Sequence, residues 1–270
     1  MKNVCLITRI KDEEKLIYYN LLYHYNIGIR NFYITFNNSN QETIKKVEQF
    51  FSEKKDAIFY PLYENNTEYN QIEQFNKMSE IAFLNGHNWI IPVDADEVLV
   101  LKTIILKNLI NKYKEFEYGY INFRWVDHIA TEKDDMNDPN FFTRWKYREP
   151  KCRPPSKTIA KWSPGNAWGH DNHLLISKRR LLEEVPIETG FYAHFVNREY
   201  EQIKKKRIRI GEAFLEKYGS ESDKPQIQEY RRWLAEGEQY FVNVWDKLCK
   251  YRKDNFEKFI YDPINPVLFS

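Results

Sequence analysis

Two carboxylates at the end of an apolar segment are the clearest chemical signal in this sequence. Residues 89–93 are apolar, and Asp94 and Asp96 follow them directly. Side chains alternate along an extended segment, so both carboxylates can face one ligand. Hard divalent cations such as Mg2+ and Mn2+ prefer oxygen ligands and keep positions open for phosphate oxygens. We therefore expect Asp94 and Asp96 to hold Mn2+ or Mg2+ against a phosphate-bearing leaving group, although an isolated pair of this kind can also be an ordinary acidic turn.

Histidines supply further candidate ligands. His194 lies within the apolar segment 191–195. Imidazole binds Mn2+ and donates hydrogen bonds to phosphate, but a lone histidine among apolar residues can equally be a core residue. A second cluster contains His170, Asp171 and His173, each of which could bind a metal or transfer a proton.

The elements that must position these residues alternate between strand and helix patterns. Apolar runs typical of buried parallel strands occur at residues 4–8, 31–36, 57–61 and 89–93. Helical patterns separate them at residues 12–27, 43–53 and 68–84. Asp12 is the expected N-cap of the first helix, and Gly28 is expected to end it. The alternation predicts an α/β fold with a mostly parallel sheet and helices on both faces.

The ligand of such a sheet is expected at one edge. In open α/β sheets, ligands bind beyond the carboxyl ends of the strands. The segments that should converge there are Thr8–Arg9, Asn37–Asn38, Pro61 and Asp94–Asp96.

The pattern changes after the acidic pair. A helix is expected at residues 102–113 and a strand at 118–125. Residues 127–155 form a long polar segment, which suggests a functional loop. Additional short strands, expected to be antiparallel, are predicted at residues 158–162, 173–177 and 190–196.

The domain boundaries follow from this change of pattern. We expect one α/β domain over residues 1–198, in two halves, 1–100 and 101–198. Residues 199–270 are expected to form a helical extension packed on that domain, with helices at 199–218 and about 225–249.

The composition argues against several classes of protein. The 270-residue chain has a formal net charge of +2, which argues against nucleic-acid binding. Its three cysteines fit neither a zinc site nor a disulfide framework. No apolar run approaches the roughly 20 residues that span a bilayer, so we expect a cytoplasmic protein. The basic run at residues 204–209 is either a solvated helix face or a site for a diphosphate or an anionic lipid surface, which leaves peripheral membrane contact open.

Several short motifs occur in a defined order. They are Lys11-Asp12-Glu13, Tyr23-His24, Phe32-Tyr33-Ile34, Asn37-Asn38-Ser39, Gln74-Phe75-Asn76, Asp94-Ala95-Asp96-Glu97, Lys157-Thr158-Ile159, Ala193-His194-Phe195 and Glu199-Tyr200. This ordered set, over about residues 3–211, resembles the GT-A glycosyltransferases of the family 2 and family 92 (DUF23-like) group. The resemblance implies a Rossmann-like GT-A fold and transfer of a sugar from a nucleotide-sugar donor.

The resemblance also implies roles for individual residues. Asp94 and Asp96 would bind the metal, with Asp96 the more direct ligand, and His194 would approach the metal or the diphosphate. Residues that would contact the nucleotide are Thr8, Arg9, Glu13, Asn37, Asn38, Asn76 and Asp94. Asn37 replaces the acid that is usual at its position, which leaves the preferred base open.

The catalytic base is less defined. The inverting reaction that the resemblance implies needs a carboxylate that accepts the proton of the acceptor hydroxyl. Asp127 and Asp171 are the candidates, and we favour Asp171 slightly because it follows the turn at Pro164-Gly165.

The expected function is therefore transfer from a nucleotide sugar, with a UDP-sugar as the expected donor, to a glycan or glycolipid acceptor in polysaccharide biosynthesis. A sugar-nucleotide nucleotidyltransferase is an alternative, but residues 8–12 lack the glycine-rich phosphate loop of that class. A metal-dependent hydrolase would need histidines at ligand spacing, which the sequence lacks. A non-catalytic carbohydrate-binding protein would have no need of Asp94 and Asp96.

Overall fold

A computed structural model describes residues 1–64, 71–169, 174–176, 180–196, 199–219 and 222–269. The strands are β1 (Val4–Ile10), β2 (Asn31–Asn37), β3 (Ile58–Glu64), β4 (Trp89–Pro92), β5 (Glu97–Leu101), β6 (Gly119–Ile129), β7 (Tyr147–Arg148), β8 (Arg153–Lys161), β9 (Trp168–Gly169), β10 (Leu174–Leu175), β11 (Leu181–Val185), β12 (Gly190–His194) and β13 (Ile260–Tyr261). The helices are α1 (Ile17–Asn26), α2 (Gln41–Glu53), α3 (Gln71–Leu84), α4 (Leu106–Lys112), α5 (Phe141–Arg144), α6 (Tyr200–Tyr218), α7 (Pro225–Glu236) and α8 (Glu238–Asp254), with short 3-10 helices η1 (Phe256–Lys258) and η2 (Pro266–Phe269).

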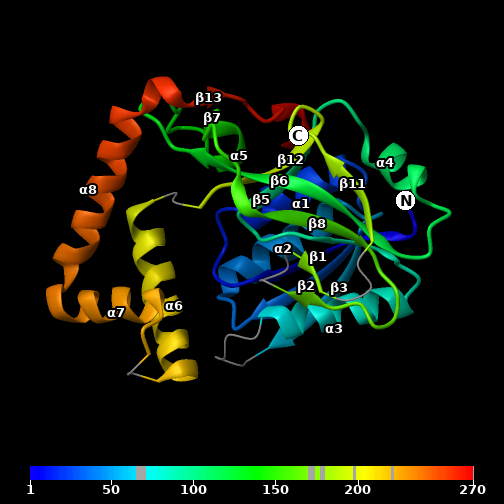
Figure 1. The fold of residues 1–270 in the computed structure, drawn as a ribbon, viewed down its shortest axis with the longest axis horizontal. Coiled ribbons are helices and arrows are strands. Elements are labelled where there is room, and N and C mark those ends of the chain that lie inside the picture. Colours follow the sequence, from blue (N-terminus) through cyan, green and yellow to red (C-terminus); the bar gives the residue numbers. More distant parts are fainter. Residues whose placement is uncertain (65–70, 170–173, 177–179, 197–198, 220–221, 270) are drawn as a thin grey trace.

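One large sheet forms the centre of the molecule (Figure 1). Its main path runs β13-β7-β6-β8-β4-β1-β2-β3. Strands β1, β2, β3 and β4 pair in parallel, whereas β8 pairs antiparallel with both β4 and β6. Strand β12 pairs in parallel with β6 and antiparallel with β5. The predicted Rossmann-like architecture with added antiparallel strands is therefore confirmed.

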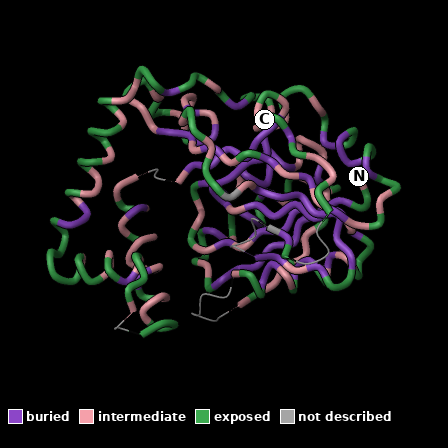
Figure 2. The backbone as a smooth tube through the Cα atoms, in the orientation of Figure 1, coloured by how far each residue is buried: buried purple, intermediate pink, exposed green. Residues whose placement is uncertain are grey.

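The two faces of the sheet are covered by different helices. Val4 and Leu6 of β1 belong to the core cluster that contains residues of α1 and α2. Cys5 and Ile7, the alternate residues, belong to the cluster that contains residues of α3. This period of two is expected for a strand that is buried on both faces. Figure 2 shows the buried residues concentrated along these strands.

The structure also contains elements that were not expected, such as α5 and β7 within the predicted loop 127–155, and three further differences concern expected elements or the acidic pair. Strand β5 directly follows the acidic pair and was not predicted. Helix α1 begins at Ile17, because Asp12 has a positive φ of 54° and its Oδ1 accepts a hydrogen bond from Asn40 N at 2.9 Å instead of capping the helix. The last predicted helix is two helices, since Gly237, at φ 63° and ψ −145°, ends α7 and precedes α8.

Helices α6, α7 and α8 form an arm at one side of the α/β body (Figure 1). Most residues of α7 and α8 are exposed or half-buried (Figure 2). Ion pairs between Lys15 and Glu199 and between Lys206 and Asp96 join the start of the arm to the body. After the arm, the chain returns to the body, where β13 pairs with β7. The boundary at residue 198 stays a prediction.

No helix in the described ranges is both long enough and apolar enough to cross a membrane.

Helix α1 holds β5 in place through two neighbouring polar side chains. Tyr23 Oη donates a hydrogen bond to Leu99 O at 3.1 Å, and Leu99 N donates to His24 Nε2 at 3.3 Å. His24 Nδ1 lies 2.8 Å from Asn20 O and is therefore the donor nitrogen of a neutral ring. Burial lowers the pKa of His24 to about 4. Protonation of His24 would therefore break the contact between α1 and β5.

This buried imidazole predicts loss of stability in acid. The folded chain binds fewer protons than the unfolded chain between the folded pKa of about 4 and the ordinary value near 6.5. The free energy of unfolding should therefore fall as pH decreases through this window, by about 2 kcal/mol from His24 between pH 7.5 and pH 5. Urea unfolding at several pH values would measure the fall.

The variant His24→Gln tests the assignment. It should be less stable than the wild type at pH 7.5, because the contact with Leu99 changes, but its stability should decline less on acidification. His128, whose pKa is also lowered to about 4 by burial, should leave a residual decline in the variant. Equal pH dependence of the two proteins would contradict the role of His24.

Candidate functional site

The acidic turn between β4 and β5 is held by a buried amide. Asn20 of α1 is 1% exposed. Its Nδ2 donates hydrogen bonds to the backbone oxygens of Ala95 at 3.1 Å and Glu97 at 2.6 Å, and lies 3.4 Å from Asp94 O. Asn20 thus ties α1 to the backbone that presents the two aspartates.

A buried lysine neutralises the first aspartate. Lys157 of β8 is 0% exposed, and its Nζ lies 3.1 Å from Asp94 Oδ2 and 2.9 Å from Glu97 Oε2. Burial opposes the charge of Lys157, but the carboxylates of Asp94 and Glu97 outweigh it and raise the pKa of Lys157. Burial raises the pKa of Glu97 to about 8, although Lys157 acts in the opposite direction. Gln71 Nε2 approaches Asp94 Oδ1 at 3.4 Å.

The second aspartate faces the imidazole of His194. His194 Nε2 lies 3.8 Å from Asp96 Oδ2, and His194 Nδ1 lies 2.7 Å from Asp127 Oδ1. The pairing of β12 explains the arrangement, because His194 stands opposite Glu97 of β5 and Asp127 of β6. Phe195 N also donates to Asp96 O at 2.8 Å. The sheet therefore brings the predicted residues Asp96, His194 and Asp127 together.

This arrangement fits a divalent cation. An ionised carboxylate only accepts hydrogen bonds, so His194 Nδ1 carries a proton toward Asp127, which leaves Nε2 as the ring nitrogen that would bind an ion beside Asp96. A carboxylate behind a histidine in this way is usual for metal-binding histidines. Two ligand atoms about 2.1 Å from one ion are at most about 4.2 Å apart, and the separation of 3.8 Å lies within that limit.

The protein would supply only part of the coordination. Within the described ranges, no three His, Cys, Asp or Glu side chains form a group that could hold a metal. Asp96 and His194 would therefore provide two ligand atoms, and the other positions would be available to phosphate oxygens and water. Asp94, predicted as a second carboxylate ligand, directs its carboxylate to Lys157 and Gln71.

Two residues predicted to contact the nucleotide carry buried polar atoms. Thr8 of β1 and Asn37 of β2 lie at the expected carboxyl ends of adjacent strands. Thr8 Oγ1 and Asn37 Oδ1 have no hydrogen-bond partner within the described part of the chain. Arg9 is half-buried beside Thr8. Unpaired buried polar atoms are uncommon, so these positions suit a polar ligand.

Three other predicted nucleotide contacts have structural roles. Glu13 accepts hydrogen bonds through its backbone oxygen from Leu16 and Ile17, at the start of α1. Asn38 has a φ of 48° and lies in an exposed turn. Asn76 Oδ1 accepts a hydrogen bond from Trp168 N at 2.7 Å. Their contacts with a nucleotide stay predictions.

Of the two candidate bases, only Asp127 lies within the described residues. Both Asp127 oxygens are engaged, Oδ1 with His194 and Oδ2 with Arg153 Nε at 2.5 Å. Asp171 lies outside the described residues, together with His170 and His173. Asp127 is therefore placed as a partner of His194, and the role of Asp171 stays a prediction.

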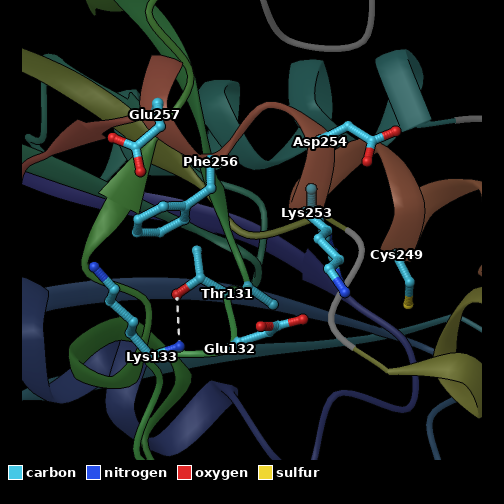
Figure 3. A pocket seen from close by; sticks show the side chains of 10 residues that line it. Thr131, Glu132, Lys133, Cys249, Lys253, Asp254, Phe256 and Glu257 are labelled. Carbon is cyan, nitrogen blue, oxygen red and sulfur yellow. Dashed lines mark hydrogen bonds between the residues drawn. The ribbon is translucent and has the colours of Figure 1, made fainter.

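A cavity of about 370 Å³ adjoins the site between α6 and the segment before α1. Its walls carry side chains of both charges, among them Glu13 and Glu212 and also Lys205, Lys206 and Arg209. A second cavity, of about 500 Å³, lies between residues 130–133 and the end of α8 (Figure 3). No residue predicted for the site lines the second cavity, and its walls combine side chains of both charges.

Sequence reasoning missed the residues that support the site. Asn20 and Lys206 contact the acidic turn from two helices, and Arg153 contacts Asp127 from β8. The available signal for Asn20 was a polar residue on the apolar face of a helix. Lys206 lies in the basic run 204–209 that the sequence marked, but the pattern does not distinguish it from its neighbours, since its contact with Asp96 depends on how α6 lies against the sheet.

Removal of the buried ammonium should destabilise the chain. In Lys157→Met, the fully buried Glu97 would lose a hydrogen-bond donor and the partly buried Asp94 would lose its cationic partner, which should cost about 1–3 kcal/mol of unfolding free energy. Denaturant unfolding would measure this cost. The double variant Lys157→Met/Glu97→Gln should recover part of the loss, because it removes a buried carboxyl that can ionise. Unchanged stability of Lys157→Met would contradict the role assigned to this charge.

Comparisons with known proteins found remote similarities to solved structures. No family model matches the sequence, and no curated protein matches it. Among solved structures, S. aureus TarS matches 78% of this chain and 40% of its own, less than half its length, at 12% identity and a TM-score of 0.43. HddC from Yersinia pseudotuberculosis matches 75% of this chain and 99% of its own, at 7% identity and a TM-score of 0.39. The mannosyltransferase PcManGT from Pyrobaculum calidifontis, solved in complex with GDP-Man and Mn2+, matches 93% of this chain and 75% of its own, at 11% identity and a TM-score of 0.47.

Proposed function

We propose that the chain is a metal-dependent, inverting glycosyltransferase of the GT-A type that uses a nucleotide-sugar donor. The observation that carries this proposal is the group formed by Asp96, His194 and Asp127, beside the carboxyl end of β4 in a parallel sheet. Such an edge is where α/β proteins bind nucleotides. The same edge carries the buried polar atoms of Thr8 and Asn37.

Mn2+ or Mg2+ would be held by Asp96 and His194. When bound, the ion would offset the negative charge that develops on the diphosphate as the bond to the sugar breaks. Asp127 would keep the His194 ring in the orientation and protonation state that directs Nε2 toward Asp96. Asp94 is already paired with Lys157. It would contact the nucleotide or the ion only if it gave up that ion pair.

For the acceptor, we propose only its chemical class and the kind of group that would accept its proton. A glycan or glycolipid hydroxyl would attack the sugar, and a carboxylate would accept its proton. Asp171 remains our candidate for this base. Asp127 is better suited to positioning His194, because both of its oxygens are already engaged in the absence of substrate. A UDP-sugar as the donor and a cytoplasmic location remain part of the proposal.

The first test is a thermal-shift screen of UDP, GDP, CMP and dTDP, each with and without Mn2+. One nucleotide should stabilise the wild type only when the metal is present. A ligand at 100 times its dissociation constant stabilises the folded state by about 2.7 kcal/mol. The variant Asp96→Ala should lose this stabilisation because it lacks one of the two ligand atoms.

A matched control is Glu184→Gln. Glu184 forms an exposed ion pair with Arg124 elsewhere in the sheet, so its loss should leave nucleotide binding unchanged. If no nucleotide stabilises the wild type with or without Mn2+, the proposed donor site is wrong and a glycan-binding protein becomes the better interpretation.

A second test addresses the partner of His194. Asp127→Asn keeps the size of the side chain but removes the charge that holds the proton on Nδ1. Loss of such a partner weakens metal binding about 10–100-fold. Isothermal titration with Mn2+ in the presence of the identified nucleotide would measure the change. Affinity equal to that of the wild type would show that His194 does not bind the ion through the tautomer that Asp127 selects.

A further inference from the structure

Helix α6 places a cation on the same carboxylate oxygen that faces His194. Lys206 Nζ lies 3.0 Å from Asp96 Oδ2, and the side chain of Asp96 is 7% exposed. His194 Nε2 lies 3.8 Å from that oxygen. In the ligand-free chain, the ammonium of Lys206 therefore offsets the charge of a nearly buried carboxylate.

The ammonium and a divalent cation compete for this position. Both are attracted to Asp96 and repel each other across a short distance in a partly buried site, where such repulsion is weakly screened. An ion held between Asp96 and His194 would therefore force Lys206 to withdraw from Oδ2. The long, flexible side chain of lysine permits such a movement without displacement of the helix.

Further basic residues lie close to Lys206, at the place where its displaced ammonium would meet an anion. Arg209 lies three residues after Lys206, on the same face of α6, and its Nη1 donates a hydrogen bond to Lys11 O at 3.4 Å. Burial lowers the pKa of Lys11, and the charges of Arg209 and Arg9 lower it further, against the opposing effect of Asp12 and Glu212. Lys206 and Arg209 thus line one cavity, whose walls also carry carboxylates such as Glu13 and Glu212, and they are cations of α6 that an anion in this cavity would meet.

We propose that Lys206 is an exchangeable counter-ion: it occupies the cation position at Asp96 in the ligand-free chain and contacts the diphosphate once the metal and the nucleotide are bound. This inference rests on the proposed function, since it takes the diphosphate of the donor as its anion. It assigns Lys206 two opposite effects. Lys206 opposes binding of the metal alone and favours binding of the nucleotide with the metal, so the two ligands bind with positive coupling.

The experiment compares the wild type with Lys206→Ala in two titrations. Electron paramagnetic resonance would follow binding of Mn2+ alone, and isothermal titration would follow binding of UDP and of GDP, as separate probes, at saturating Mn2+. Lys206→Ala should bind Mn2+ alone several-fold more tightly than the wild type. It should bind the nucleoside diphosphate about tenfold more weakly, since a hydrogen bond between charged groups is lost.

The control variant is Lys204→Ala. It removes the same charge from the same helix, but Lys204 pairs with Glu238 of α8 and not with the acidic turn. It should change neither affinity by more than about twofold. Lys206→Arg, which keeps the charge, should resemble the wild type in the titration with Mn2+ alone.

The outcomes separate this inference from the proposed function. Unchanged or weaker Mn2+ binding by Lys206→Ala would overturn the counter-ion role, whatever the nucleotide does. If the wild type binds the nucleotide and Lys206→Ala binds it equally well, only the contact with the diphosphate is overturned. If the wild type binds neither UDP nor GDP with Mn2+, the contact with the diphosphate falls together with the donor site, while the titration with Mn2+ alone still decides the counter-ion role.

Discussion

The site depends on neutralisation of acidic side chains that the sheet buries. Asp94, Asp96 and Glu97 follow one another within four residues, and a carboxylate removed from water is costly unless a cation accompanies it. The fully buried ammonium of Lys157 serves Asp94 and Glu97 from β8, whereas Lys206 serves Asp96 from outside the sheet. The permanent partner is therefore built into the sheet, and the exchangeable one lies on a helix.

This division has a structural cause. Lys157 is enclosed because β8 lies between β4 and β6, so its side chain cannot leave without disruption of the core. Asp96 instead lies where β12 meets β5 and β6, next to a helix that is not part of the sheet. The difference lies in the partners and not in the carboxylates: Lys206 is 30% exposed and Lys157 is 0% exposed, so an ion would replace the partner of Asp96 more easily than that of Asp94.

The sequence predicted the frame of the site better than its contacts. The four parallel strands and the position of Asp94 and Asp96 after β4 followed from apolar runs and their spacing, because parallel strands buried on both faces leave a strong local pattern. Strand β5 was missed because its five residues directly follow the turn. The pairing of His194 with Asp127 depends on β12 inserting between β5 and β6, a long-range choice that no local pattern encodes.

The arm formed by α6, α7 and α8 is attached to the body at both ends. Lys15 and Glu199 pair at its start, and beyond its last helix, where the chain has returned to the body, Asp262 pairs with Arg148 and Lys102. A segment fixed at two points keeps its side chains at a high effective concentration near their targets. A free ion would therefore compete with a cation that is tethered beside Asp96. This competition would set a threshold: at trace concentrations, the ion would occupy Asp96 only together with an anion that gives the tethered cation another partner.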